Sequence, residues 1–409
     1  MEVQTFKDQF DLKELELNSL LEITQAVNNN LPEESLYKIY NFTLRANLNI
    51  KRLALYVKDE TWNCKVNFGT RIDCRKVGFN RSFLNYREIS SLKDCSDCSP
   101  FEEFDTIIPV AHKDEMLAFV LVSGVSDGDI TFQFAGTNTN FLRALTNIII
   151  VAIENKKLAR RQLQQEGYRK ELEIAREVQK FLFPKSLPYE ENLKIEASYL
   201  PHHQVGGDYY DFIRINEDKF LLCVADVSGK GVPAAILMSN FQASLRIMVR
   251  QTTNLKKIIN ELNLQIQENA NGENFITFFV AIYDQSQKVL QYVNAGHNPP
   301  VLIEKNSRSI QLLEKGTTIL GSFHPLPFLS VGRIENLNSF LFFAYTDGVT
   351  ETINDRDEEF SLERIQEMLS SALGDNLKEI HQQVIDALDE FRGDVGYKDD
   401  ITMLSCEVN

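Results

Sequence analysis

The alternation of apolar and polar positions along the chain predicts two α/β regions connected by a long helix. In the first region, apolar residues recur with helical spacing over residues 15–27, and a second helix is expected over residues 36–46. Short apolar runs are typical of strands, and they occur at residues 51–56, 105–110 and 116–123. A further helix from about residue 137 completes a small mixed α/β domain.

The stretch of residues 142–183 predicts one long helix, because it contains no proline and a single glycine, Gly167. Pro184 and Pro188 then end the helix. Apolar positions recur toward both ends of this stretch, and its middle is polar. Two interpretations stay open at this point, a solvated spacer helix and a coiled coil with an imperfect heptad register.

Beyond this helix, apolar runs alternate with paired helical patterns. Strands are expected at residues 193–199, 209–215, 220–225, 276–283, 289–294, 301–304, 340–345 and 401–408. Helices are expected at residues 234–251, 255–270, 362–373 and 377–391. This order favours two packed sheets with helices on their outer faces. We therefore expect a first α/β domain at residues 1–153, a helical linker at 154–188 and a second α/β domain at 189–409.

Composition narrows the class of protein. The 409 residues are 43% hydrophobic and 25% charged, which is typical of a globular protein. A net charge of -15 argues against nucleic acid or an anionic membrane as the main partner. The N-terminus has no basic and apolar signal pattern, and the longest apolar run, residues 116–122, is too short to span a bilayer. We expect a cytoplasmic location.

In that compartment, the six cysteines are expected to be thiols. Cys95 and Cys98 have the spacing of a zinc knuckle, whereas Cys64 and Cys74 do not supply a second pair with such spacing. A metal or redox role for these four cysteines is the alternative to loop and core thiols, and the thiols are favoured.

Four short motifs in the second half of the chain each place an aspartate at the end of, or beside, an apolar strand-like run. They contain Asp208, Asp226, Asp347 and the pair Asp399 and Asp400. Carboxylates gathered at one place repel one another and lose hydration, and a shared hard cation relieves both effects. The motifs therefore look like one metal site whose ligands are dispersed along the sequence.

Several of these residues have a second interpretation. Asp226 stands before a helix and could be its N-cap instead of a ligand. Asp399 and Asp400 point apart on an extended chain, so only one of them should be a direct ligand. Asp211 is either an outer support of the site or a surface carboxylate. His297 could protonate a leaving alkoxide, but its place between two strands favours a structural turn.

In this order and spacing, the motifs resemble the type-2C metal-dependent protein phosphatases, in the bacterial SpoIIE- and RsbU-like branch. Supporting stretches lie at residues 171–179, 182–184, 295–300 and 320–321, and the resemblance covers residues 171–409. It implies an α/β/β/α sandwich and two Mn²⁺ or Mg²⁺ ions. The implied ligands are Asp208, Asp226, the backbone carbonyl of Val227, Asp347 and Asp399. Asp400 would be a support, and no basic residue stands in a matching phosphate-binding motif.

The resemblance also implies what the protein does. The activity would be direct hydrolysis of phosphoserine or phosphothreonine, by water activated between the two ions, on a phosphorylated anti-sigma-factor antagonist of the STAS type. The first domain is similar to a GAF sensor domain, which implies a small-molecule or protein signal. Apart from the resemblance, the apolar positions Leu172, Ala175, Val178 and Leu182 form a narrow stripe on the linker helix that suits a partner helix, so this helix is expected to join a homodimer. The alternative is a pseudophosphatase or scaffold that binds its partner without hydrolysis, and the complete set of aspartates argues for the enzyme.

Overall fold

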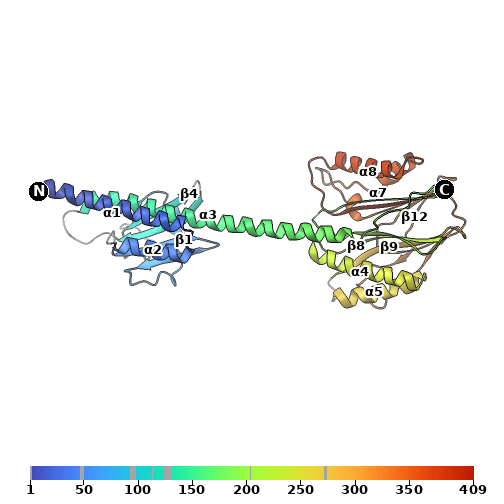
Figure 1. Cartoon of the computed structure of the whole chain (residues 1–409), viewed down its shortest axis with the longest axis horizontal. Coiled ribbons are helices and arrows are strands. Elements are labelled where there is room, and N and C mark those ends of the chain that lie inside the picture. The colour runs from blue at the N-terminus through green and yellow to red at the C-terminus, as the bar shows by residue number, and fades with distance from the viewer. Residues whose placement is uncertain are drawn as a thin grey trace. The chain divides into compact units, whose positions relative to one another are not determined.

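The chain folds as two compact units, Met1–Glu166 and Gly167–Asn409 (Figure 1). The structure is a computed structural model that describes residues 2–46, 50–92, 98–112, 115–123, 131–202, 204–270 and 274–409. The side chains of residues 2–9, 12, 131–138 and 270 lie outside this description. Each unit has its own hydrophobic core, so each is described separately.

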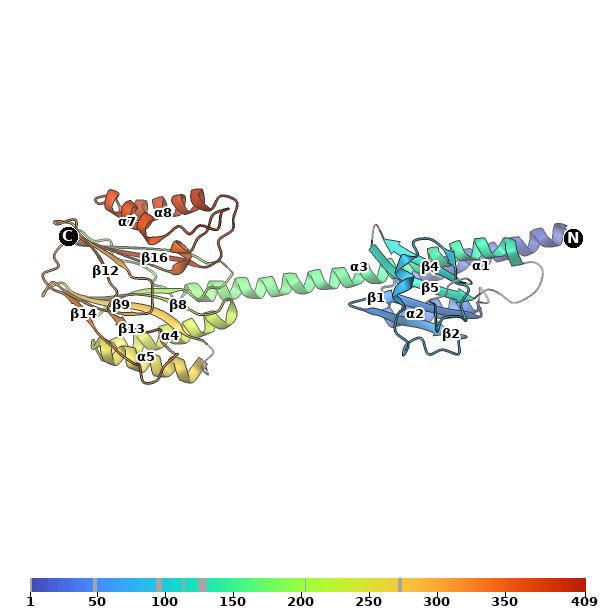
Figure 2. The same cartoon turned by 180° about the vertical axis from the view of Figure 1, so that it is seen from behind.

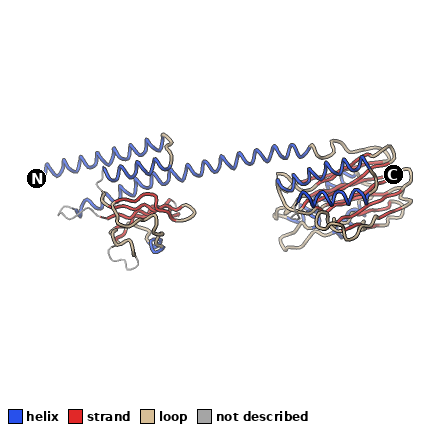
Figure 3. Tube along the Cα trace, turned by 90° about the horizontal axis from the view of Figure 1, so that it is seen from below, coloured by secondary structure: helices blue, strands red, loops and turns tan. Residues whose placement is uncertain are grey.

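The first unit is an antiparallel sheet with helices on one face. The sheet order is β2-β1-β5-β4-β3, with the strands β1 Arg52–Lys58, β2 Trp62–Phe68, β3 Ser90–Ser91, β4 Thr106–His112 and β5 Glu115–Ser123. The helices are α1 Glu2–Asn28, α2 Glu33–Ala46 and the N-terminal part of α3 Thr131–Lys180, and they gather on the same side of this sheet (Figure 3). Buried residues of the helices and of this sheet face, among them Tyr40, Leu55 and Leu145, form one core.

The opposite face of this sheet carries a second, aromatic core. Tyr56 and Phe119 of the sheet lie with Phe83 and Phe101 of the covering segment, which includes the 3₁₀-helix η1 Arg81–Asn85. Cys98 belongs to this cluster and is disulfide-bonded, so the expectation of a thiol is wrong for this residue. Cys95 lies outside the described residues, whereas the remaining four cysteines are free thiols.

The second unit contains two sheets. The first has the order β13-β10-β9-β8-β7, with β14 also paired to β10. Its strands are β7 Tyr209–Arg214, β8 Lys219–Val227, β9 Ile276–Asp284, β10 Val289–Ala295, β13 Gly316–Thr317 and β14 Gly332–Ile334. The other has the order β12-β11-β15-β16-β6. Its strands are β6 Leu193–Leu200, β11 Val301–Glu304, β12 Ile310–Leu312, β15 Phe340–Tyr345 and β16 Ile401–Val408.

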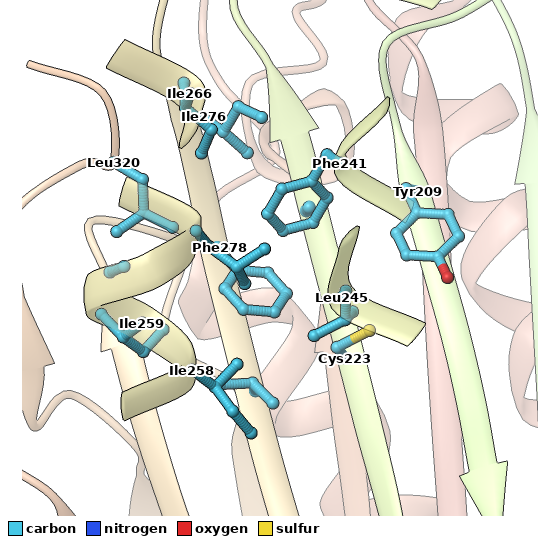
Figure 4. Packing of buried hydrophobic residues seen from close by; sticks show 14 of the residues in the cluster. Tyr209, Cys223, Phe241, Leu245, Ile258, Ile259, Ile266, Ile276, Phe278 and Leu320 are labelled. Atoms are coloured by element: carbon cyan, nitrogen blue, oxygen red, sulfur yellow. The ribbon is translucent and has the colours of Figure 1, made fainter. Parts of the chain in front are cut away.

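The two sheets pack face to face between two pairs of helices, which confirms the expected α/β/β/α sandwich. Helices α4 Val232–Gln251 and α5 Leu255–Ala270 cover the first sheet, and α7 Leu362–Ser371 and α8 Leu377–Arg392 cover the second (Figure 2). One core lies between the sheets and one under each helix pair. Figure 4 shows the core under α4 and α5, where Phe241 and Phe278 meet. Because each central strand is covered on both faces, its sequence is apolar without alternation.

Helix α4 is the one described helix that is long and apolar enough to cross a membrane. Its apolar side, with Met238, Phe241 and Leu245, is buried against the first sheet. This burial explains its hydropathy as that of a core helix.

The long helix differs from the prediction at both ends. It begins at Thr131 and ends at Lys180, where residues 142–183 were expected. After Lys180 the chain continues as a turn, with hydrogen bonds from the N–H of Phe181 to the carbonyl of Val178 (3.1 Å) and from the N–H of Leu182 to the carbonyl of Gln179 (2.9 Å). These shorter-range bonds close the helix before Pro184.

His381 of α8 provides a test of this packing. Its Nδ1 lies 2.8 Å from Oγ of Ser198 on β6, and its Nε2 lies 2.7 Å from Oγ of Ser405 on β16. Burial lowers the pKa of His381 to about 4, so the folded state holds it neutral. Below the ordinary histidine pKa of about 6.5 the unfolded chain takes up a proton that the folded protein does not, and stability therefore falls as the pH is lowered from 6.5 to 4.

We expect the titration of His381 to lower the free energy of unfolding by up to about 3 kcal/mol as the pH falls from 6.5 to 4. His381→Gln should therefore flatten the pH dependence of the free energy of unfolding, measured by urea denaturation of metal-free protein. The exposed His324 provides the matched control, and His324→Gln should leave the slope unchanged. An equal slope in His381→Gln and in the unmodified protein would contradict the assignment.

Candidate functional site

The four acidic motifs meet at one edge of the two sheets. Asp208 directly precedes β7, and Asp226 lies near the end of the neighbouring strand β8, where Tyr209 pairs with Ala225. Asp347 begins the short helix α6 Asp347–Thr350 just after β15, and the Asp399–Asp400 pair precedes the neighbouring strand β16. Strand pairing therefore brings together residues that are far apart in the sequence.

Asp208 joins the two sheets at this edge. Its side chain is 2% exposed, and its Oδ2 accepts hydrogen bonds from the hydroxyls of Thr346 (2.8 Å) and Thr402 (2.5 Å), which belong to the second sheet. Burial raises the pKa of Asp208 well above its usual range, and the nearby carboxylates of Asp226 and Asp400 raise it further. Asp208 is thus fixed in position and crowded by like charge.

Asp226 and Asp347 experience the same crowding. Burial raises the pKa of Asp226 to about 7, with added repulsion from Asp347 and Asp399. Burial also raises the pKa of Asp347, and Asp399 contributes again. Each carboxylate makes ionisation of its neighbours less favourable, and a divalent cation between them would reverse this effect.

A basic residue lies beside these carboxylates. Lys230 follows β8 in the turn that leads to α4, and its Nζ forms an ion pair with Asp399 at 2.7 Å. The same ammonium donates to the backbone carbonyl of Lys398 at 2.6 Å. The sequence interpretation found no basic residue in a matching motif. The only sequence signal was the position of Lys230, which stands four residues after Asp226.

Asp400 supports the backbone of the site. It is 7% exposed, its Oδ1 accepts from the N–H of His202 (2.7 Å), and its Oδ2 accepts from the N–H of Gly207 (2.9 Å). Its own N–H donates to Oδ1 of Asp399 at 2.9 Å. These bonds occupy both carboxylate oxygens of Asp400, as expected of a support rather than a metal ligand.

Two glycines allow the close approach of backbone at this edge. A Cβ added to Gly207 would lie 2.8 Å from the backbone oxygen of Val227, and one added to Gly348 would overlap the backbone oxygen of Asp400. The Val227 carbonyl is therefore held next to the loop that carries Asp208. Larger residues at either position would separate the segments that bear the carboxylates.

The donor set fits a hard divalent cation. It consists of carboxylates and a backbone carbonyl, the oxygen ligands that Mg²⁺ and Mn²⁺ prefer. Asp226 and Asp399 line one small hollow together with Gly207 and Lys230. In the described part of the chain, no three acidic, histidine or cysteine side chains already stand at distances that would hold an ion. Binding would thus require the carboxylates to turn toward a common centre.

Asp211 and His297 have structural roles. Asp211 is fully buried and binds Nε (2.8 Å) and Nη2 (2.9 Å) of Arg246 on α4, so the alternative of a surface carboxylate is wrong. His297 is 5% exposed, and its Nδ1 lies 2.8 Å from Oγ1 of Thr277. Burial lowers the pKa of His297 to about 4, and a neutral imidazole in a turn fits the structural interpretation.

Known proteins are similar in sequence to the part of the chain that carries this site. The family model of Stage II sporulation protein E (SpoIIE) matches residues 216–409. Phosphoserine phosphatase RsbU of Bacillus subtilis is 30% identical over 247 residues, which are 60% of this chain and 71% of RsbU. Phosphoserine phosphatase RsbP of the same organism is 26% identical over 187 residues, which are 45% of this chain and 46% of RsbP.

A solved structure agrees with the fold. The SiaA-PP2C domain of Pseudomonas aeruginosa superposes with a TM-score of 0.53 at 20% identity, covering 60% of this chain and 99% of that domain. The second unit thus has the type-2C phosphatase fold. The chain belongs to the SpoIIE- and RsbU-like family of type-2C protein phosphatases. It is accordingly an enzyme of the phosphatase class, and this class depends on metal ions.

The site predicts the effect of removing one carboxylate. Asp226→Asn and Asp347→Asn should each lower metal-dependent phosphatase activity by about 100-fold or more, because a ligand and its charge are lost. In metal-free protein, both variants should be as stable as the unmodified protein or more stable by about 1–3 kcal/mol, since repulsion is relieved. Activity assays and thermal unfolding in a chelator measure the two effects.

Asp218 supplies a matched control, because it is an exposed aspartate in the hairpin turn between β7 and β8. Asp218→Asn should change neither activity nor metal-free stability. Near-normal activity in Asp226→Asn or Asp347→Asn would show that the residue concerned is no ligand.

Proposed function

We propose that this chain is a metal-dependent serine/threonine phosphoprotein phosphatase whose first unit controls the second. One observation carries the proposal: carboxylates from four separate segments are held at one sheet edge, where burial and mutual repulsion raise the pKa values of Asp208, Asp226 and Asp347. Such an arrangement is unfavourable for folding, and it is useful when it binds a cation.

The proposed ligands are Asp208, Asp226, Asp347, Asp399 and the carbonyl of Val227, and the proposed cofactors are two Mn²⁺ or Mg²⁺ ions. When bound, such ions polarise phosphoryl oxygens and lower the pKa of water, which is the chemistry that hydrolysis of a phosphate ester needs. Protein residues supply the positioning. Thr346 and Thr402 orient the Asp208 carboxylate through its Oδ2.

Lys230 is the proposed protein contact for the substrate phosphate. Its side chain is 47% exposed, its ammonium pairs with Asp399, and both residues line the acidic hollow. If Asp399 neutralises a divalent ion, the Lys230 ammonium loses its partner and becomes available to a phosphoryl oxygen. His297 is buried and neutral, so we assign it no proton transfer.

The proposed substrate is a phosphorylated protein of the STAS type in a partner-switching pathway that regulates a sigma factor. The names of RsbU and RsbP, both phosphoserine phosphatases, support phosphoserine as the substrate group. A net charge of -15 disfavours nucleic acid as a partner, and we place the protein in the cytoplasm. The first unit, by its likeness to GAF domains, would receive a small-molecule or protein signal.

The experiment is a phosphatase assay with two substrates, a chromogenic phosphate ester and a phosphoserine-bearing STAS protein. We expect turnover of both with Mn²⁺ or Mg²⁺, lost in a chelator and restored when metal is returned. Turnover that persists in the chelator would contradict the metal site. A protein that binds the phosphorylated STAS protein but releases no phosphate with either metal would instead be the pseudophosphatase.

We further propose a homodimer formed through the linker helix. Of the four apolar residues expected to form one stripe, Val178 is the most exposed at 58%, and Leu172, Ala175 and Leu182 are half-buried. Ile174 (65% exposed) lies one turn before Val178 on the same helix face, and Phe181 (72% exposed) follows in the turn after Lys180. This face is the proposed contact with the same helix of a second copy.

Ile174→Glu combined with Val178→Glu should convert the dimer to a monomer, because paired carboxylates would have to be buried in the contact. Sedimentation velocity of the full chain measures the change. Lys170→Glu introduces a carboxylate at an exposed polar position of the same helix and should leave the dimer intact. A double variant that sediments like the unmodified protein would assign the helix the role of a spacer.

A further inference from the structure

A hollow of about 710 Å³ opens at one end of the sheet in the first unit. Its lining comes from the two hairpins that turn there, β1–β2 and β4–β5, and from the segment that begins with η1. β1 and β5 are neighbouring antiparallel strands in which Val57 pairs with Ala118, so the end of β1 lies beside the start of β5. The volume of this sheet-end hollow is within the range of about 300–1,000 Å³ that is typical of small-molecule sites.

One part of the lining is apolar and is held in place by the aromatic core of this unit. Trp62 stacks on Phe79, with their ring centroids 4.5 Å apart and their planes at 15°, and its centroid lies 5.1 Å from that of Phe119. Met116 and Leu84 also line the hollow and are 8% and 39% exposed. These side chains offer a fixed apolar surface that suits the flat ring system of a ligand.

The other part of the lining carries an excess of basic groups. Nζ of Lys58 lies 2.8 Å from Oε1 of Glu115, and this ion pair is solvent-exposed. The guanidinium of Arg87 and the ring of His112 also line the hollow, and neither has an ion-pair or hydrogen-bond partner within the described part of the chain. Because the whole chain has a net charge of -15, the hollow differs in sign from its surroundings.

We propose that the sheet-end hollow binds a small organic anion that has a flat apolar ring system. This inference rests on the proposed function, in which the first unit receives a signal, and it names the chemical class of that signal. The anionic group lies against Arg87, whose planar guanidinium donates two parallel hydrogen bonds to a carboxylate, sulfonate or phosphate. The ring system lies against Trp62.

The charges of the lining decide against other classes of ligand. A cation would be repelled by Lys58 and Arg87, and the one carboxylate, Glu115, is already paired. An uncharged apolar molecule would remove water from the Arg87 guanidinium without supplying a partner. An anion gains from both basic groups and is opposed only by Glu115, so removal of the Glu115 charge should strengthen its binding.

Trp62 is the only tryptophan of the chain, so its fluorescence reports on this hollow. Anilinonaphthalene sulfonate is the anionic probe, and phenylnaphthylamine, which has the same rings without the sulfonate, is the uncharged one. Energy transfer from Trp62 to each probe measures binding to the full chain. Arg87→Ala and Glu115→Gln change the charge of the hollow. Lys76→Ala is the matched control, because Lys76 belongs to the same unit, is 86% exposed and does not line the hollow.

For the sulfonate we expect Arg87→Ala to raise the dissociation constant by about 10-fold, because charge-assisted hydrogen bonds are lost. Glu115→Gln should lower the same constant by about twofold or more, because a like charge is removed. The dissociation constant of phenylnaphthylamine should stay within about twofold in both variants, since it carries no charge to be recognised. Lys76→Ala should leave both probes unchanged, and the melting temperature of each variant verifies that it is folded.

Equal losses of the two probes in Arg87→Ala would overturn the proposal, as would weaker sulfonate binding in Glu115→Gln. Sulfonate binding that is the same in Arg87→Ala and in the unmodified protein would be adventitious adsorption only, and would overturn it as well. The titration contains neither metal nor phosphorylated substrate, so it is independent of the phosphatase assay. If turnover is absent and the probes behave as expected, only the proposed function fails. If turnover is present and the variants bind alike, only the inference fails.

Discussion

The position of Asp208 between the two sheets is the constraint on which the rest of the second unit depends. A buried carboxylate requires hydrogen-bond donors, and Asp208 takes two of them from Thr346 and Thr402 of the opposite sheet. The spacing of the sheets, set by the aromatic core between them, therefore also sets the geometry of the acidic edge. The packing of the two sheets and the position of the Asp208 carboxylate thus depend on the same sheet spacing. A change in sheet packing would therefore move this carboxylate.

This arrangement concentrates unfavourable interactions at one edge and compensates for them elsewhere. Burial and like charge raise the pKa values of Asp208, Asp226 and Asp347, which disfavours the folded state at neutral pH when no cation is present. The three apolar cores of the unit provide the opposing stabilisation. Lys230 gives local relief through its ion pair with Asp399. The apolar cores of the unit therefore allow the folded state to tolerate the repulsion at this edge.

Features encoded locally were predictable from the sequence, and features made by contacts between distant segments were not. The strand before Asp226 is a continuous apolar run, so both the strand and the location of the carboxylate at its end follow from nearby residues. Lys230 meets the segment of Lys398 and Asp399, and Asp211 meets Arg246, only because loops and strands adopt a particular register.

Gly167 is a local weak point in the long helix. It is the first residue of the second unit, and a Cβ built there would meet no atom within 4 Å, so no packing requirement explains a glycine at this position. In a helix interior, glycine costs about 1 kcal/mol relative to alanine. Gly167 consequently weakens the helix near the place where one unit passes into the other. A conformational switch needs two states of similar free energy, and a glycine in the connecting helix would lower the free energy that separates a straight helix from a bent one.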